Sequence, residues 1–189
     1  VNIMYERVKK MAEAASMMAN VDYDMELISG IYEIMPNRFG AGIIQNNFEL
    51  LGEIKYTDSE IDYANTILKE TGKELKGLDG TIKPLRPTLP ATGGSTDVGD
   101  VSQVVPVVRL STTTAAKDGP WHSWAVVACT GMSIGHKGMI YASKALAMTM
   151  LDLYKNPKLI EGVKEEFIER KGDKVYVPQI PPGPPKLID

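Results

Sequence analysis

The chain has 189 residues, of which 43% are hydrophobic and 24% charged, the balance of an ordinary soluble domain. Its net charge of −3 argues against a nucleic-acid partner, and no apolar run reaches the roughly 20 residues that span a bilayer. The single cysteine, Cys129, excludes an internal disulfide and a cysteine-cluster metal site. Together with the absence of a signal-peptide pattern, these features predict a cytoplasmic protein.

The first part of the chain predicts a helix followed by a strand. Apolar residues, many of them methionines, recur at helical spacing over residues 2–19, so we expect their face to pack in a core. Acidic and apolar residues then alternate over 22–32, which is typical of a half-buried strand. The chain starts at Val1 and enters a helical pattern at once, so we expect a piece of a longer protein.

The rest of the chain predicts more helices and one further strand. Periodicity and end signals indicate helices over 38–51, 58–71, 138–154 and 157–170. The apolar run Val104–Leu110 predicts a buried strand, and the long stretches 72–96 and 112–137 are expected to be irregular. Two strands do not make a complete α/β sheet, so other strands are expected from sequence elsewhere.

Two familiar enzyme motifs fail on their spacing. Tyr141 and Lys144 lie three residues apart, whereas short-chain dehydrogenases place this pair four apart so that the cation lowers the pKa of the phenol. The chain also lacks a Gly-rich dinucleotide turn after an early strand, and its glycines do not form a phosphate-binding P-loop.

A glycine-containing loop is the first candidate binding element. Gly94 lets the backbone approach a ligand, and the hydroxyls of Ser95 and Thr96 are suited to hold a carboxylate or an amide. The same residues fit a helix cap, in which Asp97 and Asp100 complement the helix dipole. The spacing leaves both interpretations open.

The only two histidines are the other candidates. His122 lies in an irregular stretch just past a predicted strand, between Trp121 and Trp124, where α/β sheets place their ligands. A metal ligand, an acid/base and an ordinary structural histidine all remain open for it. His136 lies near a predicted helix N-terminus, and both a structural and a catalytic role fit it. A separation of 14 residues matches no local zinc motif.

Taken in order, these segments resemble the C-terminal part of the aminoacylase/carboxypeptidase-type zinc metallopeptidases, a family of amidohydrolases. The matching stretches are 93–102, 105–110, 122–124 and 133–139. The resemblance implies an α/β catalytic domain with two zinc ions and an inserted lid domain that often mediates dimerisation. It assigns residues 1–34 to the last helix and strand of the lid, and 35–189 to the C-terminal part of the catalytic domain.

The resemblance also implies roles for individual residues. His122 matches the last metal ligand of the family, and Gly94, Ser95 and Thr96 match a Gly-rich loop near the substrate. His136 matches a motif of the subgroup that acts on aminobenzoyl-glutamate, without an assigned role. The remaining family ligands, a His-x-Asp, a Glu-Glu pair and a further Asp, Glu or His, all precede the lid in the family. Nothing here matches them, because neither histidine is followed by x-Asp and no histidine precedes residue 122.

The resemblance therefore implies a zinc amidohydrolase in which zinc-bound water attacks the amide of a small N-acyl amino acid. Because a catalytic zinc needs about three protein ligands, we expect this chain to be inactive alone. The expected partners are the N-terminal part of the same enzyme and either a second copy, through the lid, or a second hydrolase subunit. The alternative is a non-catalytic partner-binding module, or a degenerate remnant of such an enzyme.

Overall fold

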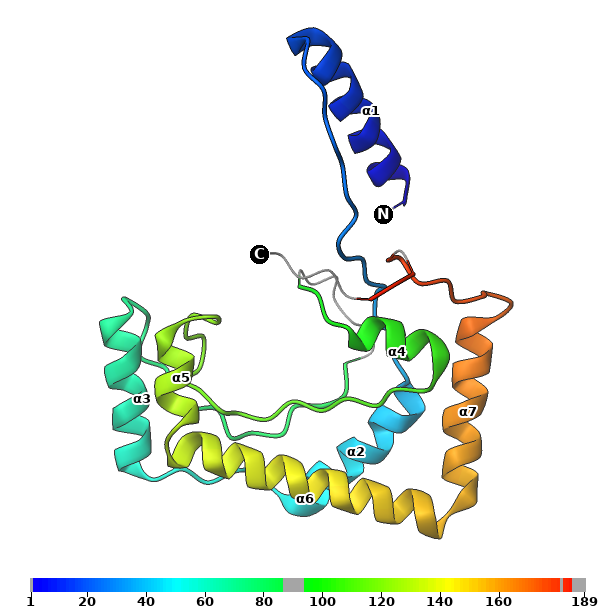
Figure 1. The fold of residues 1–189 in the computed structure, drawn as a ribbon. Helices are drawn as coiled ribbons and strands as arrows, with labels where there is room; N and C mark the ends of the chain where they lie inside the picture. Colours follow the sequence, from blue (N-terminus) through cyan, green and yellow to red (C-terminus); the bar gives the residue numbers. More distant parts are fainter. Residues whose placement is uncertain (1, 87–93, 181, 185–189) are drawn as a thin grey trace.

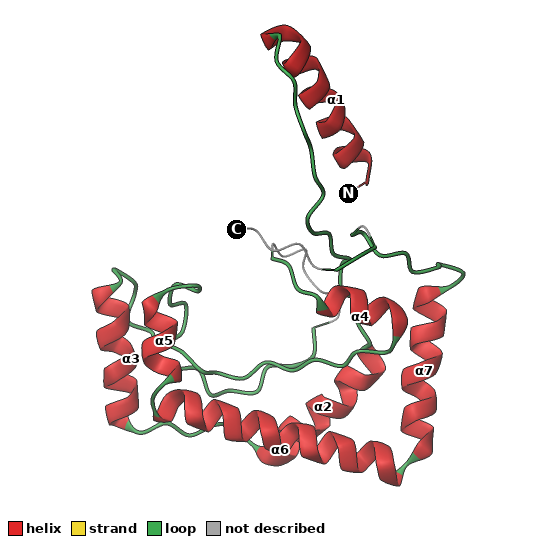
Figure 2. Ribbon diagram, in the orientation of Figure 1, coloured by secondary structure: helices red, strands yellow, loops and turns green. Residues whose placement is uncertain are grey.

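A computed structural model describes residues 2–86, 94–180 and 182–184, and in these ranges the only regular elements are helices (Figures 1 and 2). Gly93, the first residue of the matching stretch 93–102, lies outside the described residues, as do residues 87–92 of the stretch 72–96. The helices are α1 (Asn2–Ala19), α2 (Arg38–Leu51), α3 (Asp58–Glu70), α4 (Val98–Val104), α5 (Trp124–Thr130), α6 (Ser133–Lys155) and α7 (Pro157–Lys171).

Local end signals account for most of the helix boundaries. The Asn37 side chain accepts a hydrogen bond from the Gly40 N–H at 2.8 Å and begins α2. Thr57 and Glu60 form the predicted capping box at the start of α3, and Asn156 caps α7. The predicted helices over 2–19, 38–51, 58–71 and 157–170 are therefore confirmed to within one residue at their ends.

The two predicted strands are wrong for the part of the chain that the structure describes. Residues 22–32 run as a loop. In the predicted strand Val104–Leu110, Val104 ends α4 and residues 105–110 run as a loop, and Figure 2 draws no strand in either segment. A β-strand forms only when a neighbouring strand supplies the other half of its hydrogen-bond ladder. These two segments have the residue composition of strands, but the described residues offer them no neighbouring strand. The described residues thus do not show the expected α/β class or the strand of a lid.

The stretch 112–137, expected to be irregular, contains a helix and the start of another. Ser123 begins α5, because its Oγ accepts from the Ala125 N–H at 3.3 Å, and α6 starts at Ser133, five residues before the predicted start. The seven residues of α5 are too few for periodicity to reveal. Ala125 and Cys129 of α5 are buried against α3, so packing rather than local pattern decides this element.

The packed body has two parts that share α6. At one end α3, α5 and the first turn of α6 enclose the main apolar cluster, whose largest fully buried side chains are Leu68 and Ile134. Along the rest of its length α6 contacts α2 and α7 (Figure 1). Both candidate histidines belong to the first part, because His122 precedes α5 and His136 lies in the first turns of α6.

Helix α1 stands apart from this body (Figure 1). None of its residues is buried, and Met18 is 90% exposed. The expectation that its methionine face packs in a core is therefore wrong within the described residues, because a loop over residues 20–37 carries the helix away from the other elements.

A small junction joins that loop to α4. Asp100 accepts a hydrogen bond from the Tyr32 N–H at 3.2 Å, and the buried Ser102 hydroxyl accepts one from the Met35 N–H at 2.8 Å. A Cβ added at Gly99 would overlap the Tyr32 carbonyl, so only glycine permits this approach. The junction fixes where the N-terminal segment meets the body and holds α4 in place.

The whole arrangement is open. Its accessible surface is 13733 Å², whereas a compact protein of 20.7 kDa exposes about 8,900 Å². None of the helices described here is both long enough and apolar enough to cross a membrane.

Candidate functional site

His122 is held on a tight turn and faces solvent. Its backbone has φ 56°, a left-handed conformation that histidine adopts more readily than most residues. The Ser123 hydroxyl donates to the Pro120 carbonyl at 2.6 Å and caps α5, so the turn is fixed on both sides. Trp121 and Trp124 flank the turn and are 71% and 55% exposed. The result is an exposed imidazole on a rigid support, between two exposed indoles.

The imidazole of His122 has the freedom that a ligand needs. No hydrogen bond or ion pair within residues 2–86, 94–180 and 182–184 engages its ring. In the same ranges, however, no three His, Cys, Asp or Glu side chains gather where they would hold a metal ion together. The described part of this chain therefore does not supply a complete zinc site, and no hydrolytic step is assigned to it.

The glycine-containing loop leads directly into the first turn of α4. The Thr96 carbonyl accepts from the Gly99 N–H at 3.0 Å, and the Thr96 hydroxyl accepts from the Val98 N–H at 3.4 Å. Asp97 occupies the cap position without a side-chain bond, and Ser95 is exposed. Gly94 has φ 119°, which disfavours any other residue there. These contacts engage Thr96 at the start of α4, and the substrate role of Gly94, Ser95 and Thr96 stays a prediction.

The described residues do not bring the predicted site residues together. No hydrogen bond joins the loop at Gly94–Thr96 to His122, and α4 and α5 occupy separate parts of the molecule (Figure 1). His122 and His136 are themselves separated by α5, whose seven residues span about 10 Å.

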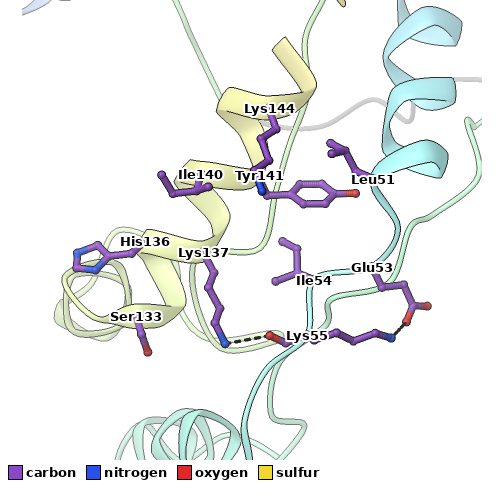
Figure 3. A pocket seen from close by; sticks show the side chains of 10 residues that line it. All are labelled: Leu51, Glu53, Ile54, Lys55, Ser133, His136, Lys137, Ile140, Tyr141 and Lys144. Carbon is purple, nitrogen blue, oxygen red and sulfur yellow. Dashed lines mark hydrogen bonds and ion pairs between the residues drawn. The ribbon is translucent and has the colours of Figure 1, made fainter. Parts of the chain in front are cut away.

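His136 lies at a shallow pocket of about 490 Å³ between the first half of α6 and the segment after α2 (Figure 3). Its ring and the side chain of Ile140 point away from Lys137 and Tyr141, so His136 lines the rim. The residues that line the pocket are Leu51, Glu53, Ile54, Lys55, Ser133, His136, Lys137, Ile140, Tyr141 and Lys144.

Tyr141 and Lys144 both line this pocket, but the phenol has a structural task. Its hydroxyl donates to the Gly52 carbonyl at 2.8 Å, beyond the end of α2. Burial raises the pKa of Tyr141, the opposite of what a dehydrogenase phenol requires. The structure thus supports the rejection of that motif on its spacing.

Next to the pocket, Glu60 pins α3 to α6, a role that sequence analysis missed. Its buried carboxylate accepts from the Ser133 hydroxyl and from the Lys137 ammonium, each at 2.6 Å. It also accepts from the Thr57 N–H at 2.7 Å. Burial alone would raise the pKa of Glu60, but these hydrogen bonds outweigh it and lower the pKa from 4.5 to about 2.

The capping box signalled only the local half of this network. Thr57 and Glu60 are three residues apart and predict each other, whereas Ser133 and Lys137 lie more than 70 residues further along. A Ser-x-x-x-Lys pair places both donors on one helix face, but no nearby sequence feature indicates which residue accepts their hydrogen bonds. The arrangement of this pocket is therefore a tertiary feature.

The chain is similar to one of the subunits of the p-aminobenzoyl-glutamate hydrolase of Escherichia coli (strain K12). The two are 26% identical over 203 aligned positions, which cover 94% of this chain and 42% of the hydrolase subunit. No family model matches the chain, and no solved structure matches it.

The similarity to the hydrolase subunit confirms the resemblance found from the ordered motifs. Nearly all of the chain aligns, so His122, His136 and the Gly94–Thr96 loop come from a sequence that is related along its length. The chain spans less than half the length of the hydrolase subunit.

Proposed function

We propose that this chain is the C-terminal portion of a zinc-dependent amidohydrolase that cleaves the amide bond of N-acyl amino acids of the aminobenzoyl-glutamate type. The observation that carries the proposal is the similarity to the p-aminobenzoyl-glutamate hydrolase subunit over 94% of the chain. The exposed and unengaged imidazole of His122 supports it, because a ligand of a shared metal site must be open to the other contributors.

In this proposal His122 donates one nitrogen to a zinc ion, and the remaining ligands come from polypeptide outside this chain. In the complete site, zinc would polarise the carbonyl group of the substrate amide and activate a water molecule. Gly94, Ser95 and Thr96 contact the substrate near the start of α4. The chain by itself is inactive, because one histidine does not hold a catalytic zinc.

The domain assignment belongs to the same proposal. Residues 1–34 form the end of a lid that pairs with a second copy or a second hydrolase subunit, and residues 35–189 belong to the catalytic domain. The α/β sheet is completed by strands from the remaining polypeptide, next to the extended segments of this chain. The openness of the structure supports this, because its surface of 13733 Å² far exceeds that of a closed domain.

The test replaces each histidine in turn in the full-length enzyme. His122→Ala is expected to lose bound zinc and to lower the rate of p-aminobenzoyl-glutamate hydrolysis at least 100-fold. This is a larger drop in rate than replacing a residue that only orients a metal ligand would cause. His136→Ala is the matched control for zinc content, since its ring lies on the pocket rim. Unchanged zinc content and activity in His122→Ala would remove the assignment.

A partner-binding module without catalysis is the second candidate. The exposed face of α1, which includes Met11 and Met18 and buries nothing, favours it. The sequence upstream of Val1 separates the two candidates. An in-frame His-x-Asp and Glu-Glu pair supports the enzyme, and a start codon at this point supports the module.

A further inference from the structure

The C-terminal tail, residues 174–180, returns from α7 to the place where the N-terminal segment enters the body. After α7 ends at Lys171, the tail runs back to α4 and lies against the loop over residues 20–37, which we call the connector (Figure 1). A Cβ added at Gly30 of the connector would lie 2.7 Å from the Gln179 Cβ of the tail. The two segments are therefore in direct contact.

Two tyrosines tie the tail to the connector. The Tyr32 hydroxyl donates a hydrogen bond to the Val177 carbonyl at 2.9 Å. The rings of Tyr32 and Tyr176 lie 5.5 Å apart with an interplanar angle of 59°, a tilted contact of the kind that aromatic pairs favour. Because the two tyrosines come from opposite ends of the chain, these contacts exist only while the tail lies on the connector.

The carboxylate of Asp100 joins both segments to α4. One of its oxygens accepts from the Tyr32 N–H at 3.2 Å, and the other accepts from the Tyr176 hydroxyl at 2.9 Å. This second hydrogen bond raises the pKa of Tyr176, because ionisation of the phenol would remove the bond and place two negative charges together. Hydrogen bonds to an ionised acceptor are stronger than those between neutral groups. Asp100 therefore holds the connector and the tail at the same point.

A second set of contacts holds the connector a few residues further along. The Ser102 hydroxyl accepts from the Met35 N–H at 2.8 Å, and the side-chain amide of Gln103 donates to the Glu33 carbonyl at 2.9 Å. Both side chains belong to α4, so this part of the connector stays bound to the body whether or not the tail is in place. Residues 30–32, in contrast, are held by α4 and the tail together.

We infer that residues 174–180 are a strap that latches the N-terminal segment onto α4, with Asp100 as the shared acceptor of the latch. Helix α1 has no buried residue, so its placement depends on where the connector is anchored and not on contacts of its own. With the strap in place, the segment pivots before residue 30. With the strap released, it pivots at residues 33–35, and about three more residues let α1 reach about 10 Å further. The C-terminal tail thus controls how far the N-terminal helix extends from the body.

The experiment measures both halves of the latch in the full-length polypeptide, because the coupling between two bound segments acts equally in both directions. Hydrogen–deuterium exchange resolved to single amides reports on the connector, and the rate of trypsin cleavage after Lys174 reports on the tail. Tyr176→Phe removes only the hydroxyl that donates to Asp100, and Tyr32→Phe removes only the hydroxyl that donates to the tail. Tyr154→Phe, at a position that is 81% exposed, is the matched control.

In Tyr176→Phe we expect the Tyr32 amide to exchange about tenfold faster, the effect of losing a hydrogen bond to a charged group, while the Met35 amide keeps its rate because Ser102 still holds it. In Tyr32→Phe we expect cleavage after Lys174 to become about fivefold faster. The control variant is expected to change neither rate. An unprotected Tyr32 amide in the wild type, or an unchanged rate of either reporter in its variant, overturns the inference. So does equal acceleration of the Tyr32 and Met35 amides, which would mean that α4 itself has come loose.

Discussion

The carboxylate of Glu60 allows a quantitative test of how α3 is joined to α6. Its pKa falls from 4.5 to about 2 in the folded chain, which corresponds to about 3 kcal/mol at 1.36 kcal/mol per pH unit. Because the folded-state pKa is the lower one, this stabilisation is complete above about pH 4.5 and is lost as the pH falls toward 2. By pH 3 about 2 kcal/mol of it is gone, by the same linkage.

The assay is urea unfolding at pH 7 and pH 3 for the wild type, Glu60→Gln and the exposed-site control Glu70→Gln. Hydrogen bonds and nearby cations also lower the pKa of Asp79 and of Glu166, so every variant loses stability in acid. The informative quantity is the difference between variants. Glu60→Gln is expected to be about 2 kcal/mol less stable than wild type at pH 7 and to lose about 2 kcal/mol less on acidification. An identical acid loss in Glu60→Gln and wild type would refute the reasoning.

Two further substitutions test the packing. Gly99→Ala forces a methyl group onto the Tyr32 carbonyl and is expected to lower the free energy of unfolding by about 2 kcal/mol. The control is Gly42→Ala, whose added methyl group would meet nothing within 4 Å, so that it is expected to be neutral or stabilising by up to about 1 kcal/mol. Equal stabilities of the two variants would show that the junction between α4 and the loop at Tyr32 does not form. Asn47→Ala removes a buried donor to Thr149 and Asp152 and is expected to cost about 1–3 kcal/mol in unfolding free energy, measured with urea, against little change for the exposed neighbour Asn46→Ala. Matching midpoints for the two variants would show that these hydrogen bonds between α2 and α6 do not contribute.

His122 illustrates how far a site residue can be predicted from sequence. The types of its neighbours and its place after an apolar run identified it as a candidate. The structure adds that its backbone is left-handed and that its ring is exposed, which no pattern of residue types reports. His136 is the contrary case: its place near a helix start was predicted, but its position on the rim of a pocket depends on how α6 meets the segment after α2.

The sequence by itself determined the long helices and most of their ends, because a capping box such as Thr57–Glu60 and an Asn-Pro start at residues 156–157 act within a few residues of the chain. Tertiary structure decided the rest. Residues 22–32 and 105–110 have the composition of strands but remain loops, because a hydrogen-bond ladder needs a partner strand, which a local sequence pattern cannot supply. Helix α5 and the Glu60 network likewise follow from contacts between residues distant in sequence, where packing and hydrogen bonding outweigh local preference.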